Sequence, residues 1–313
     1  MSATAAVRVA ERTKPAVDTE RGHRLRLRAL YVLAIVTNLA IFFYGFDYYK
    51  LPVMDRPFSP KHHLLRPSGP IGLYLGFMGV ALFVGIFLYP IRKHWAWLGQ
   101  IGKTRHWLDI HVLMGLTAPF IIAFHSTLKF RGIAGMAFWI MFAVSASGVV
   151  GRYLYAQIPR RVTTAELSMK ELQELQESLS RELASQRLLP EADLRALLRL
   201  PNAQQAGRLP IPIALLYMMI LDVVRLFGVA RLRRHASGES FRTFFGFFPS
   251  QHRELEKAIH AAAEEAALSK RLLFLSRSQK VFHLWHVVHK PFSYAFAVLA
   301  LLHIGLQFVL GYF

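Results

Sequence analysis

Two pairs of histidines lie in apolar stretches of this sequence at the same interval. His111 and His125 are fourteen positions apart, as are His289 and His303. At about 100° and 1.5 Å per residue, fourteen helical steps bring a side chain back to within about 40° of the same face, roughly 21 Å along the axis. If both stretches are helices, each presents two imidazoles on one stripe, near opposite leaflets of a membrane.

Imidazoles in this arrangement are suited to holding two iron porphyrins, one above the other. Neutral imidazole is a good iron ligand, and haem supplies apolar bulk that fills a helical bundle. One such histidine alone would be interpreted as a packed or hydrogen-bonded residue, but two pairs of equal spacing favour ligation. Spacings that start from His106 or His286 instead miss the shared face by about 100°.

The absence of cysteine narrows the chemistry further. It excludes disulfides, cysteine-ligated iron–sulfur clusters and covalent attachment of haem. The sequence also has neither a GxGxxG motif nor a P-loop, so no nucleotide-binding domain is expected. We therefore predict two noncovalently held b-type haems as the cofactors.

The apolar stretches indicate a membrane protein. Of the 313 residues, 54% are hydrophobic and 18% are charged, whereas a soluble protein carries about 25% charged residues. Five stretches approach the ~20 residues that a spanning helix needs. They cover residues 29–46, 70–90, 106–128, 133–155 and 291–313. We expect an all-α membrane protein with about five transmembrane helices forming a dihaem bundle.

Basic residues set the expected orientation. The net charge is +19, and Lys and Arg cluster beside the apolar stretches, which indicates a positive-inside bias and attraction to anionic lipid, not to nucleic acid. Residues 1–28 then form a basic cytoplasmic tail, residues 29–156 hold four spans, and residues 281–313 hold the C-terminal haem-ligating span. We expect an integral protein of a bacterial inner membrane, with the C-terminus outside.

Residues 157–280 are expected to form a helical cytoplasmic insert. An amphipathic helix is predicted over 163–186, and another helix from near Gln251. The apolar run 211–230 is ambiguous, because it contains Asp222 and Arg225 and has basic residues on both flanks. Such a run is expected to lie in the membrane plane or to re-enter, with a sixth span as the open alternative.

Whether residues 211–230 span the membrane decides which histidines pair. If it does not span, the third and last transmembrane helices run parallel. His111 then pairs with His289 on the cytoplasmic side, and His125 pairs with His303 on the outer side. If it spans, the pairing inverts. We predict the parallel arrangement.

Further residues suit a haem pocket. Small side chains let a porphyrin approach a helix, and basic side chains at the membrane edges can bind propionates. The small residues are Gly115, Ser147 and Gly148, and the basic ones are Arg105, Lys129, Arg131, Arg152 and Lys290. Helix packing in lipid and the positive-inside bias explain many of them equally well. Asp109 is expected in an interfacial salt bridge with Arg105 or His106 rather than on a proton path.

The paired histidines, with thirteen residues between them on two transmembrane helices, resemble dihaem b-type membrane cytochromes. The pattern is similar to cytochrome b of quinol-oxidising bc complexes and to ferric-reductase-like transmembrane domains, and covers roughly half of the chain. The segment GVVGRYLYAQIPR is also similar to bacterial members of the ferric-reductase-like group. The resemblance implies a four-helix haem bundle. The sequence departs from these families in lacking a PEWY-type quinol motif and a flavin or NADPH domain.

These features favour an electron-transfer subunit of a quinone-linked membrane complex. The expected partners are the quinone pool, redox subunits such as a cytochrome c or an iron–sulfur protein, and anionic lipid. No residue is assigned a catalytic role. Two alternatives stay open: a transmembrane ferric, oxygen or superoxide oxidoreductase, and a haem-free transporter or scaffold.

Overall fold

The computed structural model describes residues 3–157, 191–200, 209–237, 248–249 and 252–311, together with positions 174, 177, 181 and 189. Of residues 3–19 only the backbone is described. The amphipathic helix predicted over 163–186 falls almost wholly outside these residues. All regular secondary structure in the described part of the chain is helical, which confirms the all-α prediction.

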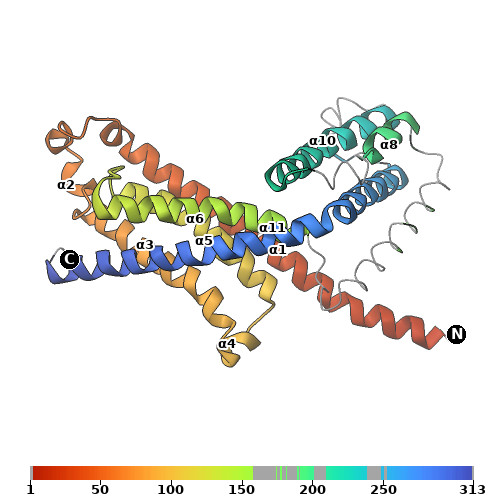
Figure 1. Cartoon of the computed structure of the whole chain (residues 1–313), viewed down its shortest axis with the longest axis horizontal. Helices are drawn as coiled ribbons and strands as arrows, with labels where there is room; N and C mark the ends of the chain where they lie inside the picture. The colour runs from red at the N-terminus through yellow and green to blue at the C-terminus, as the bar shows by residue number, and fades with distance from the viewer. Residues whose placement is uncertain are drawn as a thin grey trace. The chain divides into compact units, whose positions relative to one another are not determined.

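The helices follow the order of the predicted spans (Figure 1). They are α1 (Ala3–Tyr49), the 3-10 turn η1 (Arg56–Phe58), α2 (His62–Leu65), α3 (Pro70–Arg92), α4 (Ala96–Gln100), α5 (Thr104–His125), α6 (Gly132–Gln157), α8 (Glu191–Leu198), α10 (Ile211–Ser237) and α11 (Arg253–Val309). A proline at the first turn of α3 favours its start there, because that position needs no backbone N–H.

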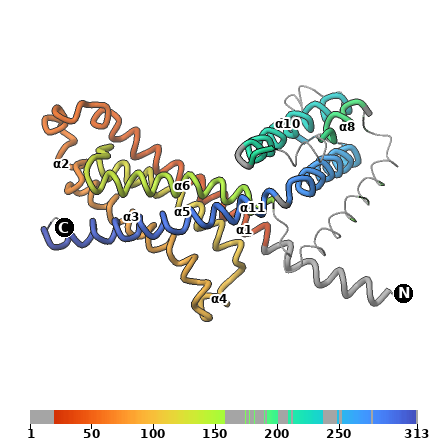
Figure 2. Tube along the Cα trace, in the orientation of Figure 1, coloured from red at the N-terminus to blue at the C-terminus, as the bar shows by residue number. Residues whose placement is uncertain are grey.

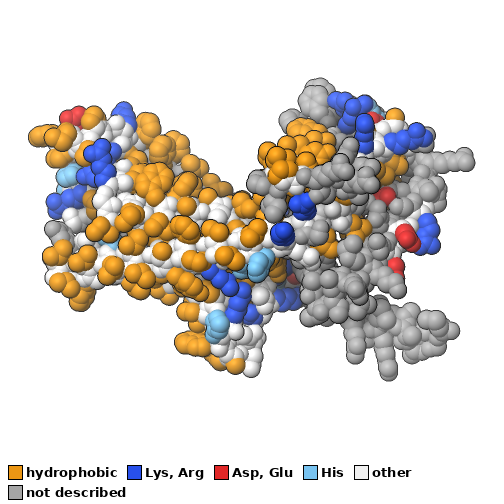
Figure 3. All heavy atoms as spheres, viewed as in Figure 1, with side chains coloured by type: hydrophobic (Ala, Val, Ile, Leu, Met, Phe, Trp, Pro, Cys, Tyr) orange, Lys and Arg blue, Asp and Glu red, His pale blue; other side chains and the backbone are white. Residues whose placement is uncertain are grey.

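Six helices in the described residues are long and apolar enough to cross a membrane. They are Glu20–Tyr49, His62–Arg92, Thr104–His125, Gly132–Gln157, Ile213–Ala236 and Arg277–Val309. Large apolar side chains cover much of their surface (Figure 3). Such surfaces belong in lipid. The sequence predicted five of these spans; the sixth candidate is α10.

The chain forms two compact units. One comprises residues 1–152 and 287–313, here called the bundle unit, and the other comprises residues 153–286, here called the insert unit. The helix α11 contributes its first part to the insert unit and its last part to the bundle unit.

In the bundle unit, α3 packs closely along α5, and α1 also contacts α5 (Figure 2). One core cluster joins Tyr48 and Tyr49 of α1 to Leu75 of α3 and Phe124 of α5. A second joins α5 and α6, with Phe296 of α11 packed against it. These apolar contacts hold the histidine-bearing helices in one bundle.

The helices α5 and α6 run antiparallel. Ser145 Oγ donates to the Gly115 carbonyl at 2.6 Å, and the Arg152 guanidinium lies 2.7 Å from the Asp109 carboxylate. The later residue of α6, Arg152, thus contacts the earlier residue of α5, Asp109, as antiparallel helices require. The end of α6 lies beside the start of α5.

The apolar half of α11 runs parallel to α5. Its His289 ring lies 2.7 Å from Ser147 Oγ, at the end of the bundle where α5 begins. At the opposite end, His303 interacts electrostatically with His125. We call these two ends the His111 end and the His125 end. The parallel direction is the one on which the predicted histidine pairing depends.

The insert unit is built on an antiparallel packing of α10 against the first part of α11. Ala214 and Met218 of α10 pack with Phe274, while Leu232 packs with Leu255 and Ile259. The short helix α8 covers the same side of α10. The unit therefore has an apolar core of its own.

A buried arginine fastens the loop at the His125 end. The Arg56 guanidinium is only 6% exposed and donates to the carbonyls of Leu51, Tyr49 and Thr127. Thr127 follows α5 in a turn where it and Leu128 have positive φ. Arg56 thus connects the loop after α1 to the turn that directly follows His125.

We predict that Arg56→Met lowers the thermal stability of the purified protein by several degrees. Methionine keeps the apolar part of the side chain but leaves the carbonyls without a hydrogen-bond donor. Each buried carbonyl that loses its donor lowers the free energy of unfolding by about 1–3 kcal/mol. The control is Arg66→Met in the same loop, since Arg66 is exposed. The measurement is Tm in detergent, and equal effects of the two substitutions would contradict the role given to Arg56.

Candidate functional site

The two histidines of α5 are both oriented by backbone carbonyls of α3. His111 Nδ1 lies 3.0 Å from the Ile86 carbonyl oxygen, and His125 Nδ1 lies 2.8 Å from that of Gly72. A carbonyl can only accept a hydrogen bond, so each Nδ1 must carry the proton. A neutral ring then has an unprotonated Nε2, and this is the nitrogen that is available for a metal.

His289 contacts a serine of α6. Its Nδ1 lies 2.7 Å from Ser147 Oγ, and the same hydroxyl lies 2.8 Å from the Val144 carbonyl oxygen. When the hydroxyl donates to that carbonyl, its oxygen accepts from the His289 N–H. Sequence analysis predicted Ser147 as a small side chain beside a porphyrin; the structure gives it the contact with His289.

His303 completes the set at the His125 end. It lies on the less exposed stripe of α11 together with His289, Ser293 and Phe296. Within the described residues the ring has no hydrogen-bond partner, and it interacts electrostatically with His125. His289, beside Ser147, lies at the level of α5 where His111 and Gly115 lie.

The number of protein ligands at each site suits a porphyrin. Among the residues that the structure describes, no three His, Cys, Asp or Glu side chains gather closely enough to hold a metal ion. A pair of imidazoles alone leaves most of a metal's coordination positions unfilled. A porphyrin would supply four nitrogens of its own, and a pair of imidazoles could then hold its iron.

Two of the predicted small residues have open space beside them. A Cβ built on Gly115 or Gly148 would meet no atom within 4 Å. The backbone of α11 also approaches α5 at few points, whereas α3 packs closely on α5. Open space therefore lies beside Gly115, about one helical turn from His111 on α5.

Gly76 is a residue that the sequence analysis missed. A Cβ built there would lie 2.9 Å from Cε1 of His125, closer than such contacts ordinarily come. The glycine therefore leaves room for the imidazole ring against α3. Gly76 lies four residues after Gly72, whose carbonyl accepts the hydrogen bond from His125. This spacing indicates a role for Gly76 only once His125 is known to lie next to α3.

Two lysines lie together at the His111 end. Burial and the neighbouring Lys290 ammonium lower the pKa of Lys93. Lys93 Nζ is 5.1 Å from the Tyr89 ring centroid, and the Tyr89 and His111 ring centroids are 5.0 Å apart. Neither lysine has an ion pair with a carboxylate in the described part of the chain. Two ammonium groups placed together favour an anionic group beside them. Lys93 was not among the predicted site residues.

The arginines expected near the cytoplasmic haem are engaged with carboxylates instead. Arg105 lies 2.9 Å from Glu20, and Arg152 lies 2.7 Å from Asp109. Asp109 is buried and also meets His23 at 3.1 Å. The expected salt bridge is present, but its partners are not the predicted ones. They come from α1 and α6, which local sequence spacing along α5 could not reveal.

The other predicted cations lie past His125. Lys129 and Arg131 are exposed and follow the turn that ends α5. No described carboxylate pairs with either of them. Their position beyond the histidine is the one expected for cations at a membrane edge.

We predict that Ser147→Ala weakens cofactor binding at the His111 end. Loss of a partner that orients a ligating histidine costs about 10–100-fold in metal affinity. Ser145→Ala is the matched control, since Ser145 bonds only the Gly115 carbonyl among described residues. Titration of haem into the haem-depleted protein should show one weakened site for Ser147→Ala alone; unchanged affinity at both sites would contradict the assignment.

No family model, curated protein or solved structure matches this chain. The resemblance to dihaem b-type cytochromes therefore stays a prediction from the histidine spacing. What the site can do chemically follows from its own geometry: imidazoles of fixed tautomer in two levels of a membrane bundle, space beside them, and cations at both ends.

Proposed function

We propose that this chain binds two b-type haems and serves as the electron-transfer subunit of a quinone-linked membrane complex. His111 and His289 would hold one haem, and His125 and His303 the other. The observation that carries the proposal is the orientation of His111 and His125. In each ring Nδ1 is bonded to a carbonyl oxygen that can only accept, so the Nε2 that a metal would use carries no proton.

Bound haem would supply the one-electron chemistry, and two haems at different depths would connect the two sides of the membrane. The protein's contribution is ligation, orientation and insulation. The α3 carbonyls orient two of the rings, and Ser147 contacts a third. The apolar faces of the spans exclude water, and the lysine pair Lys93 and Lys290 would neutralise anionic substituents at the His111 end.

A role without haem fits the geometry less well. An imidazole Nε2 inside an apolar bundle needs a donor or a metal, since a buried polar atom without a partner costs about 1–3 kcal/mol. His111 and His125 use their only N–H on carbonyls of α3, so each Nε2 has no proton to donate. A transporter or scaffold would have no evident use for two rings fixed in this way.

The proposed setting is a bacterial inner membrane with the N-terminus in the cytoplasm. Electrons would pass between the quinone pool and redox subunits such as a cytochrome c or an iron–sulfur protein. The chain lacks cysteine and nucleotide motifs, so partners must supply the remaining carriers. The exposed Lys129 and Arg131 offer positive charge beside the site at the His125 end.

We predict that His125→Ala and His303→Ala each remove about half of the haem absorbance of the purified protein, because each breaks one of two independent sites. The matched control is His260→Ala on the polar part of α11, where the side chain is 82% exposed. The reduced-minus-oxidised spectrum measures the loss. Full haem content in both bundle variants would contradict the ligand assignment.

A second prediction separates electron transfer from oxygen chemistry. A short-chain quinol should reduce the haems of the intact protein, and carbon monoxide should bind slowly or not at all, because two imidazoles would hold each iron and leave it no open position. Stopped-flow spectroscopy follows both reactions. Rapid carbon monoxide binding without reduction by quinol would favour the alternative of a transmembrane oxidoreductase.

A further inference from the structure

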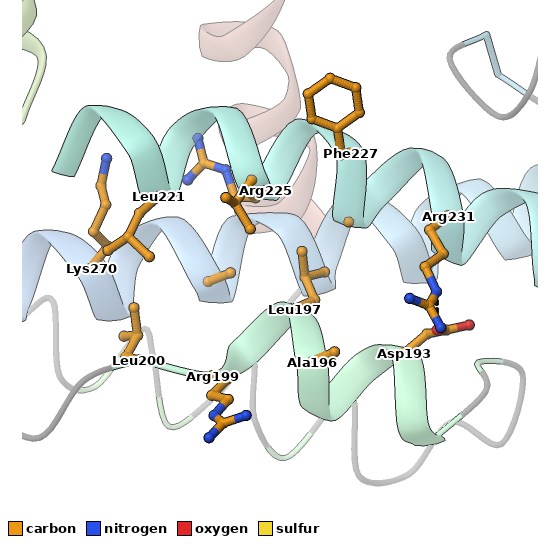
Figure 4. A pocket seen from close by; sticks show the side chains of 13 residues that line it. Asp193, Ala196, Leu197, Arg199, Leu200, Leu221, Arg225, Phe227, Arg231 and Lys270 are labelled. Atoms are coloured by element: carbon orange, nitrogen blue, oxygen red, sulfur yellow. Dashed lines mark ion pairs between the residues drawn. The ribbon is translucent and has the colours of Figure 1, made fainter. Parts of the chain in front are cut away.

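The helix α10 buries one face and leaves the other apolar and exposed. The exposed positions recur at helical spacing and include Ile213, Leu216, Ile220, Val223, Val224 and Phe227, each between 47% and 58% exposed. At its C-terminal end the stripe borders a pocket, which Val224 and Phe227 line together with Ala196 and Leu197 of α8 (Figure 4). This stripe is too long and continuous for a surface in water.

The charges of α10 lie away from that stripe. Asp222 meets Lys270 of α11 at 2.5 Å, Arg225 at 3.0 Å and the Tyr153 hydroxyl at 2.7 Å. Burial lowers the pKa of Lys270 even though Asp222 lies beside it. The charged side chains that made this run ambiguous in the sequence are therefore satisfied within the insert unit, and the outward face carries none of them.

Two observations argue against α10 as a span. The first is its neighbour. Along residues 214–232, α10 packs against residues 255–274 of α11. This part of α11 carries six acidic or basic side chains: Glu256, Lys257, Glu264, Glu265, Lys270 and Arg271. If α10 crossed the bilayer, it would bring these charges into the hydrocarbon, where they are costly.

The second observation is the direction of the helices in the bundle unit. The chain leaves this unit after Arg152, which lies beside Asp109 at the His111 end. It returns before His289, which lies beside Ser147 at the same end. The segment in between must therefore begin and end on one side of the membrane. Since α10 is its only candidate span among described residues, a single crossing by α10 is ruled out.

We infer that α10 lies in the plane of the membrane, with α11 bending where it passes from the insert unit to its span, and that α10 docks the insert unit on the anionic leaflet at the His111 end. The apolar stripe would lie among the acyl chains, as in other in-plane amphipathic helices. Arg231 and Arg234 continue the stripe by helical spacing and are exposed. Arg231 pairs with Asp193, whereas Arg234 has no carboxylate partner in the described chain and would bind a phospholipid headgroup.

Single cysteines test the topology, because the chain has none of its own. Leu209→Cys and His235→Cys place thiols at the two ends of α10 in the full-length protein. In sealed vesicles of known orientation, both should react with a membrane-impermeant maleimide from the same side. Reaction of the two ends from opposite sides would overturn the inference.

A second measurement tests what covers the stripe. A fluorophore on Ile220→Cys, in proteoliposomes of phosphatidylcholine and phosphatidylglycerol, should be quenched by nitroxide-labelled lipid. The same fluorophore on Lys257→Cys should not, since Lys257 is exposed on the charged part of α11. Equal, weak quenching at both positions would show that protein, not lipid, covers α10 and would overturn the inference.

The role of anionic lipid has its own control. Quenching at position 220 should be stronger in bilayers that contain phosphatidylglycerol than in phosphatidylcholine alone. Arg234→Gln should reduce this difference, by about fivefold in partitioning for one arginine near the surface. Arg253→Gln, an exposed arginine at the start of α11, should leave it unchanged. A difference that is insensitive to Arg234 would refute the headgroup contact. None of these results depends on haem.

Discussion

The hydrogen bond from an imidazole Nδ1 to an accepting oxygen is the interaction on which this structure depends. A histidine in an apolar bundle must satisfy both ring nitrogens, and an oxygen that only accepts decides which nitrogen keeps the proton. The carbonyls of Ile86 and Gly72 make that choice for His111 and His125, and Ser147 contacts Nδ1 of His289. In the two rings of α5 the second nitrogen is unprotonated, so the packing of α3 on α5 sets the tautomer that a metal would need.

The direction of α11 is the second constraint, and it follows from the same contacts. Because His289 meets Ser147 at one end and His303 meets His125 at the other, the two histidine-bearing helices are parallel. Parallel helices require the chain between them to stay on one side. The long insert, the pairing of Asp222 with Lys270 and the apolar outer face of α10 are all consistent with that requirement.

Much of the bundle could be predicted from the sequence, because the length and the helical periodicity of an apolar stretch depend only on residues close together in the chain. The equal spacing of the histidine pairs and the apolar stretches gave the spans and one common face on each helix. The contacts of Asp109 with His23 and Arg152, the place of Gly76 under the His125 ring and the approach of Lys93 to Lys290 join residues far apart in the chain. Single-sequence patterns carry no information on such contacts, so these could not be predicted.

The most direct test of the central claim is the ratio of haem to protein in the full-length chain. Haem is extracted and quantified as its pyridine complex after expression with ample haem supply, and protein is measured by amino-acid analysis. Four imidazoles in two levels predict two noncovalent haems per chain, both low-spin in electron paramagnetic resonance. A haem-free protein, or one haem per chain at saturation, would contradict this account.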